Sequence, residues 1–232
     1  MDMRPKLSRR GFLTRLSAAG GALLLGGCDQ LSQSPTFRDV LSKAEGVTQG
    51  VQRFVLSQRA MAREFSESDI SAYFKPNGSI NIDDSSYQGQ VKDGFSQWRL
   101  KIDGLVARPA ALSLDELRRM PSRTQITRHD CVEGWSAIGK WKGAQLGPLL
   151  QSVGLKPEAR YLVFHCADTL APDARYYESI DLIDAFHPQT ILAYDMNDAA
   201  LTVPHGAPIR LRVERQLGYK HAKYVMGIEA VS

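Results

Sequence analysis

The spacing of apolar residues predicts one long helix near the N-terminus of this chain. Between Phe37 and Phe65, apolar side chains recur close to every 3.6 residues. This period is typical of a helix with one buried face. Gly, Asn, Ser and Asp then dominate residues 77–89, which favours a loop-rich segment ahead of a second region.

Beyond residue 90 the pattern changes to short alternating segments. The expected strands are 98–104, 160–166, 191–194 and 209–213. Ser113 and Glu116 have the spacing of a capping box, so a short helix should open there and stop at Pro121. A second helix over 147–153 should end at Gly154. Short strands and scattered helices without regular alternation predict an α+β fold.

The first 27 residues have the pattern of an export signal. Ser8 to Leu13 contains the twin arginines Arg9 and Arg10, and the apolar run from Leu16 to Leu25 follows. That run is too short to span a bilayer, which takes about 20 apolar residues. We therefore interpret 1–27 as a twin-arginine signal, the alternative being a basic, disordered N-terminus.

Leu25 to Cys28 resembles a lipoprotein cleavage box, so Cys28 is expected to become the lipidated first residue of the mature chain. The alternative is ordinary cleavage near Gly27, which leaves Cys28 as a stray thiol. Asp29 follows and favours retention at the inner membrane. The predicted organisation is a signal (1–27), a tether with the amphipathic helix (28–70) and a catalytic domain (71–232).

Charge adds little once the signal is removed. The chain has 29 basic and 25 acidic residues, and residues 1–27 hold five and one of them, so 24 of each sign remain. A balanced chain lacks the surplus of cations that nucleic-acid binding requires. The remaining length of about 205 residues suffices for one domain with a good core.

Two cysteines fall in the expected domain, Cys131 and Cys166. In an oxidising compartment they could form a disulfide. Zinc is a weaker alternative, because His129 and His165 supply the right donors without a recognised ligand spacing. A thiolate is also the soft, anionic ligand that a redox metal takes.

Several runs, in one order, resemble the molybdopterin-binding domain of the sulfite-oxidase superfamily. They begin with Phe74 and Asn77-Gly78, and continue through Trp98 to Gly104, Leu112 to Leu117, Cys131-Val132-Glu133-Gly134-Trp135, Phe164 to Asp168, Ala193 to Asn197, His205 to Arg210 and Gly218 to Lys223. The resemblance covers about residue 70 to the end. It implies a mixed β-sheet domain of the sulfite-oxidase type.

The resemblance also implies the cofactor, a molybdenum atom held by one molybdopterin and by the thiolate of Cys131. A ligated thiolate is not free to form a disulfide. The residues that match cofactor-binding positions of the family are Tyr73, Phe74, Asn77, Cys166, His205, Arg210, His221, Ala222 and Lys223. Arg210 suits the terminal phosphate because its guanidinium can donate two hydrogen bonds. Taken alone, Arg210 would be placed on the solvated face of a strand.

The residues after Cys131 favour one substrate class. True sulfite oxidases carry two arginines there, whereas this chain has Val132-Glu133-Gly134-Trp135, closer to the periplasmic methionine-sulfoxide reductase type. Tyr176 matches a family tyrosine near the metal and could donate a hydrogen bond to a substrate oxygen, or be a buried structural residue. We therefore expect a small-molecule substrate and oxygen-atom transfer, with reduction of S- or N-oxides favoured. The alternatives are sulfite-type oxidation and an inactive, lipid-anchored binding module.

The partners follow from the same resemblance. No haem attachment motif and no cysteine cluster for iron–sulfur occurs in the sequence. Electrons should therefore come from a separate membrane cytochrome or quinone-linked protein. We expect a monomer on the periplasmic side of the inner membrane, attached through Cys28.

Overall fold

The computed structural model describes residues 33–55, 60–171 and 174–232. The chain divides into a helical unit that ends at Gln58 and a compact unit, Arg59–Ser232. The expected signal and the lipidation site at Cys28 lie outside the described residues. None of the described helices has the length and apolar character needed to cross a membrane.

The helical unit contains α2 (Pro35–Val55), so the predicted helix is confirmed in its first two thirds. Its expected extension to Phe65 is wrong, because residues 60–66 are not helical and Glu64 instead forms a bridge with Thr127. Val40, Leu41, Val47 and Val51 are each more than half exposed.

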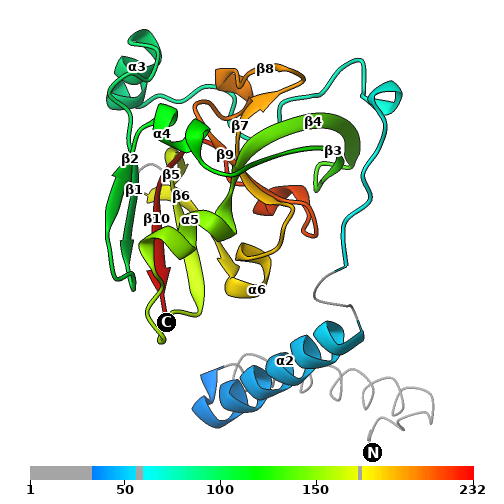
Figure 1. The fold of residues 1–232 in the computed structure, drawn as a ribbon. Coiled ribbons are helices and arrows are strands. Elements are labelled where there is room, and N and C mark those ends of the chain that lie inside the picture. The colour runs from blue at the N-terminus through cyan, green and yellow to red at the C-terminus, as the bar shows by residue number, and fades with distance from the viewer. Residues whose placement is uncertain (1–32, 56–59, 172–173) are drawn as a thin grey trace, which may run out of the picture. The chain divides into compact units, whose positions relative to one another are not determined.

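The compact unit is built on two five-stranded sheets (Figure 1). The first has the order β2-β1-β10-β5-β6, and its strands are β1 (Leu100–Gly104), β2 (Ala110–Leu112), β5 (Tyr161–Ala171), β6 (Ala174–Asp181) and β10 (Val225–Val231). Within it β1 and β10 are parallel, and the other pairs are antiparallel.

The second sheet has the order β3-β4-β7-β8, with β9 paired to β7. Its strands are β3 (Ser122–Cys131), β4 (Trp135–Gln145), β7 (Thr190–Met196), β8 (Ala199–Ala200) and β9 (Arg210–Val213). All its pairs are antiparallel. The helices of the compact unit are η1 (Glu67–Asp69), α3 (Ser85–Lys92), α4 (Leu114–Arg119), α5 (Leu146–Val153), α6 (Leu182–Ala185), η2 (Val203–His205) and η3 (Gly218–Lys220).

Both sheets contribute to the main core. Leu100, Phe164 and Ile228 come from the first sheet, and Leu192 and Leu211 come from the second. All five are at most 1% exposed. Mixed sheets with peripheral helices confirm the α+β class.

Local chemistry explains the elements that the pattern predicted. Ser113 accepts a hydrogen bond from the Glu116 amide, and the Glu116 carboxylate accepts one from the Ser113 amide, so both halves of the capping box form. Gly154 ends α5 with a φ of +69°, which suits a glycine. The four predicted strands are present, and the one starting at 160 continues to Ala171.

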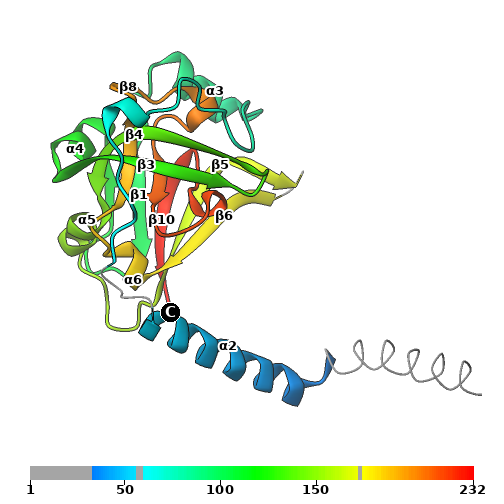
Figure 2. The same cartoon turned by 90° about the vertical axis from the view of Figure 1, so that its right-hand side faces the viewer.

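The feature that matters most for the site is the long β3–β4 hairpin. Ten residue pairs, from Ser122–Ala144 to Cys131–Trp135, join the two strands. In Figure 2 the tip of this hairpin lies beside the end of the β5–β6 pair. Residues from the tips of the β3–β4 and β5–β6 hairpins therefore meet at one edge of the compact unit.

Candidate active site

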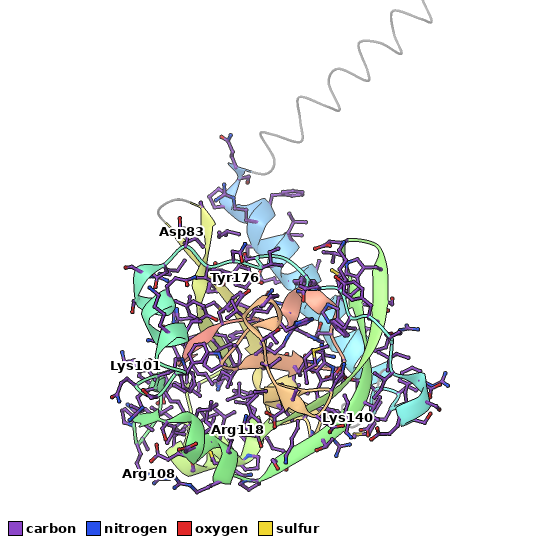
Figure 3. The ribbon with its side chains drawn as sticks, turned by 90° about the horizontal axis from the view of Figure 1, so that it is seen from above. Asp83, Lys101, Arg108, Arg118, Lys140 and Tyr176 are labelled. Atoms are coloured by element: carbon purple, nitrogen blue, oxygen red, sulfur yellow. The ribbon has the colours of Figure 1, made fainter. Side chains whose placement is uncertain are left out.

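One cavity of about 280 Å³ lies where these two hairpins meet η3. Its walls come from residues 77–79, 131–133 and 168–170, from Tyr176 and Tyr219, and from residues 221–223. Six of the residues predicted from the sequence therefore share one cavity, namely Cys131, Tyr176, Asn77, His221, Ala222 and Lys223. Figure 3 labels Tyr176 toward the interior of the view from above, whereas Lys101 and Arg108 lie at its outline.

Cys131 is the last residue of β3 and faces Trp135 across the hairpin. The turn between them closes through a hydrogen bond from the Gly134 amide to the Cys131 carbonyl, 3.0 Å, and Gly134 has a φ of +85°. Such a tight turn leaves the thiol partly exposed in the cavity wall. Cys131 and Cys166 are both free thiols, so the disulfide alternative is wrong.

The zinc alternative also fails on geometry. His165 is exposed and its Nε2 lies 3.0 Å from Glu229 on the neighbouring strand β10. Among the described residues no group of three or more His, Cys, Asp and Glu side chains lies close enough to hold a metal ion. Cys131 is the one cysteine among the described residues that line this cavity.

Glu133 is held at the cavity wall by three donors. Its carboxylate accepts hydrogen bonds from Trp135 Nε1 (3.0 Å), from the Gly78 amide (3.3 Å) and from Lys75 Nζ (3.3 Å). These bonds, the one from Trp135 most of all, lower the pKa of Glu133. A negative charge is thus fixed one residue away from Val132 and two from Cys131.

Tyr176, on β6, points its hydroxyl toward η3. The hydroxyl donates to the Tyr219 carbonyl (3.2 Å) and lies 3.3 Å from Glu178 Oε2. Burial, and then the charge of Glu178, raise the pKa of Tyr176, so the phenol keeps its proton at neutral pH. It is therefore a hydrogen-bond donor in the cavity wall.

Behind the cavity lie two fully buried arginines on β9, Arg210 and Arg212. The alternative of a solvated face for Arg210 is wrong, because β9 is buried on both sides. Both guanidinium groups stack on Trp141, at 5.1 Å and 4.3 Å from the ring centroid. Arg212 pairs with the buried carboxylate of Glu214 at 2.7 Å.

Arg210 has no such counter-charge among the described residues. Its guanidinium donates to the His205 carbonyl (3.2 Å), to Asn77 Oδ1 (3.3 Å) and to the His221 carbonyl (3.3 Å). Its Nε has no partner within the described part of the chain. Burial and the neighbouring Arg212 lower the pKa of Arg210 to about 9. The site therefore holds an excess of buried positive charge.

Two histidines pack against this cluster in neutral form. Arg212 Nη1 can only donate, so His129 Nδ1, 3.1 Å away, accepts and the ring proton sits on Nε2. His221 Nε2 faces the Val213 carbonyl at 2.9 Å and must therefore carry the proton of its ring. Burial, assisted by Arg212, lowers the pKa of both rings. The single ring donor of His221 is already used by Val213.

Lys223 completes the positive side of the cavity. Its ammonium donates to the carbonyls of Asn77 (2.7 Å), Pro204 (2.7 Å) and Ser79. Burial, and then Arg210, lower the pKa of Lys223 to about 7. The three carbonyls tie the segment 77–79 to the C-terminal part of the chain.

The remaining predicted residues do not line the cavity. Phe74 is buried against the rings of Trp135, Trp141 and His205, and its carbonyl lies 3.1 Å from His205 Nε2. Cys166 belongs to the main core, where burial raises the pKa of its thiol.

Tyr73 is 73% exposed. The structure adds to the wall several residues that were not predicted as site residues, namely Asp168, Thr169, Leu170 and Tyr219, of which Asp168 and Tyr219 lie in runs that resemble the family. Asp168 to Leu170 lie on β5 and Tyr219 lies in η3, two elements that only the fold brings together.

Comparison with known proteins places these features in a family. Residues 88–232 match the oxidoreductase molybdopterin binding domain. The chain belongs to this family. It is a molybdopterin-dependent oxidoreductase of the α+β type that the sequence runs predicted.

Individual relatives cover nearly the whole chain. A protein of Azospira oryzae named as a protein-methionine-sulfoxide reductase subunit, YedZ1, is 36% identical over 222 residues, which are 95% of this chain and 80% of that protein. The protein-methionine-sulfoxide reductase catalytic subunit MsrP of Xanthomonas axonopodis pv. citri is 31% identical over 96% of this chain and 70% of its own length.

The solved structure of the sulfane dehydrogenase SoxCD from Paracoccus pantotrophus has a similar fold. Its TM-score is 0.53 at 24% identity, and the match covers 59% of this chain and 38% of that one. At this identity the likeness supports the fold.

The residues present fit the cofactor of the family. The unpaired Nε and the uncompensated charge of buried Arg210 call for an anion, and the molybdopterin phosphate is one. Cys131 offers the single thiolate at the cavity wall, and Asn77 and Lys223 connect that wall to Arg210. Cys131 would hold the molybdenum and the Arg210 region would hold the phosphate.

Cys131→Ser tests the first assignment. Removal of the soft ligand should lower turnover by at least about a hundredfold, because even changes in the shell around a metal ligand cost 10- to 100-fold. Pterin should remain bound, since the buried cations are unchanged. Molybdenum and pterin content and steady-state turnover measure this outcome. The matched change Cys166→Ser, at the other free thiol, should keep most of the turnover, and full activity in Cys131→Ser would contradict the assignment.

Proposed function

We propose that this oxidoreductase reduces S-oxides, with methionine sulfoxide as the representative substrate. The observation that carries the proposal is the charge of the cavity wall. None of the described residues that line it is an arginine, and its charged side chains are Glu133, Asp168 and Lys223. Lys223 already donates to three carbonyls. A neutral sulfoxide avoids the large free-energy cost of desolvating a charge, which a sulfite dianion would incur here because no free cation in the described wall offsets it.

The reaction is balanced by two electrons and two protons. The sulfoxide R₂S=O accepts both, and the products are the thioether R₂S and water. When bound, the molybdenum cofactor supplies the two-electron chemistry, while the protein orients the substrate and provides electrostatics. Tyr176 keeps its proton and can turn its hydroxyl from the Tyr219 carbonyl toward the sulfoxide oxygen. This hydrogen bond would orient the bound substrate.

The relatives support this direction of the reaction. Both proteins described above are named for protein-methionine-sulfoxide reductase, and they align with 95% and 96% of this chain. The segment Cys131-Val132-Glu133-Gly134-Trp135 holds the acid and the indole that distinguish the site from one built for sulfite.

Sulfite oxidation would need other cations at the cavity. Lys220 is the nearest candidate in sequence, but its ammonium donates to Glu178 Oε1 (2.7 Å) and the Ser179 carbonyl (3.0 Å) and does not line the cavity. An inactive binding module, in turn, would have no need for a partly exposed thiol beside an excess of buried cations.

The cellular setting belongs to the same proposal. The twin arginines Arg9 and Arg10 and the lipobox ending at Cys28 support export in folded form and attachment to the periplasmic side of the inner membrane. A separate membrane cytochrome or quinone-linked protein would then supply the electrons, consistent with the word "subunit" in the names of the relatives. The protein would contain one copy of this chain.

Substrate preference can be measured directly. With reduced viologen as donor, kcat/KM for methionine sulfoxide should exceed kcat/KM for sulfite, measured with ferricyanide as acceptor, by at least about tenfold. This ratio corresponds to about 1.4 kcal/mol, a modest cost for placing an anion in a cavity without free cations. Cys131→Ser is the blank for both assays. A higher kcat/KM for sulfite would overturn the proposal.

Export can be tested separately. Replacing Arg9 and Arg10 with Lys should leave the precursor in the cytoplasm, because the receptor reads the arginine pair. Cell fractionation and the size of the product measure this. Cys28→Ala should instead be exported but released from the membrane. Normal processing of the Lys variant would contradict the twin-arginine signal, and a membrane-bound Cys28→Ala product would contradict the lipid anchor.

A further inference from the structure

Three exposed apolar side chains surround the mouth of the cavity. Val132 and Leu170 are both 69% exposed, and Tyr219 is 48% exposed. Val132 lies in the β3–β4 turn, Leu170 near the end of β5 and Tyr219 in η3, yet all three line the cavity that contains Cys131. We name Val132, Leu170 and Tyr219 the apolar rim.

Single exposed apolar residues are common on proteins and need no explanation. The apolar rim differs because three separate segments converge on one opening. Tyr177 shows the contrast. It follows Tyr176 on β6 and is 60% exposed, but it does not line the cavity, since successive side chains on a strand point to opposite faces.

The backbone that carries Tyr219 is held in place. A Cβ atom on Gly218 would lie 2.5 Å from the His129 ring, so only glycine allows this approach of η3 to β3. The Tyr219 carbonyl accepts the hydrogen bond of Tyr176, and Lys220 is anchored to Glu178. The backbone of Tyr219 is therefore held in place beside the cavity.

The position of the apolar rim determines which part of a bound substrate contacts it. A substrate whose sulfur reaches the Cys131 end of the cavity has to place its remaining carbon groups between the three side chains. Apolar groups gain free energy when they bury surface there, at about 25 cal/mol per Å². Polar groups lose hydration and find few partners, because the exposed parts of the rim carry one hydroxyl among them.

We propose that the apolar rim determines substrate specificity, and that it selects methionine sulfoxide flanked by apolar residues in an extended peptide. This inference rests on the proposed S-oxide reduction. The occupant is the pair of side chains that neighbour the oxidised methionine. The carboxylate of Glu133 at the same mouth adds to the preference against acidic neighbours.

Two capped, uncharged tripeptides test the inference, Ac-Leu-Met(O)-Leu-NH₂ and Ac-Ser-Met(O)-Ser-NH₂. The ratio of their kcat/KM values, measured on one enzyme preparation, is independent of the fraction of chains loaded with cofactor. For the wild type we expect a ratio of about ten in favour of the leucine peptide. Tyr219→Ser and Leu170→Ser should each lower it to about two, whereas Tyr177→Ser should leave it at about ten.

The outcomes separate the inference from the proposal beneath it. A wild type that reduces neither peptide contradicts the S-oxide function itself. Equal rates for both peptides in the wild type, or a ratio that stays at ten in both Tyr219→Ser and Leu170→Ser, overturns the apolar rim while S-oxide reduction stands. A ratio that falls equally in Tyr177→Ser also overturns it, since the effect would then not come from the cavity mouth.

Discussion

The interaction on which the site depends is the stacking of two buried arginines on Trp141, with one carboxylate to balance them. Arg212 has Glu214 and the hydroxyl of Thr127, and it fixes the tautomer of His129. Arg210 has carbonyls, an amide oxygen and a ring, but no anion among the described residues. A buried cation without a counter-ion costs several kcal/mol. We infer that the fold tolerates this cost because an anionic cofactor offsets it when bound.

The rest of the site is arranged around that cluster. Strand β9 carries the arginines and pairs with β7, which in turn pairs with β4. The β3–β4 hairpin in turn places Cys131 in the wall of the cavity. Close packing makes this possible: a Cβ at Gly143 would lie 2.2 Å from the Leu192 carbonyl, so β4 can approach β7 only with glycine there. Cys131 thus lines the cavity, while Arg210 is buried behind its wall and hydrogen-bonds to Asn77 and to the His221 carbonyl.

Much of this could be predicted from the sequence, but for different reasons in different places. The capping box at Ser113 and the strand at 209–213 follow from local rules of hydrogen bonding and alternation. The ordered motifs identified Cys131 and Lys223, which do lie together in the cavity. Burial of Arg210 could not be predicted from alternation, because arginines that alternate with apolar residues give the same pattern as a strand with one solvated face, whereas β9 is buried on both faces.

The apolar rim shows the limit of such predictions. Val132 lies in the β3–β4 turn, Leu170 on β5 and Tyr219 in η3, and their meeting depends on the pairing of β3 with β4 and of β5 with β6. For the helix 35–55 the predicted period agrees with the structure, and Val40 and Val47 on it are more than half exposed. A period describes one face of a helix and does not supply the partner that covers it.

The central claim is tested most directly by the variant Arg210→Met. Its bound pterin and the free energy of unfolding of its cofactor-free form are the quantities to measure. Loss of the buried cation should lower bound pterin by at least about tenfold, since charge-assisted hydrogen bonds to a phosphate contribute about 1.5–3 kcal/mol each. Because that cation is uncompensated without the cofactor, the cofactor-free variant should unfold in urea with a free energy no lower than that of the cofactor-free wild type. Arg118→Met, which removes another arginine stacked on an aromatic ring (Tyr194, 4.3 Å), should retain full pterin. Full pterin content in Arg210→Met, or marked destabilisation of its cofactor-free form, would contradict the account.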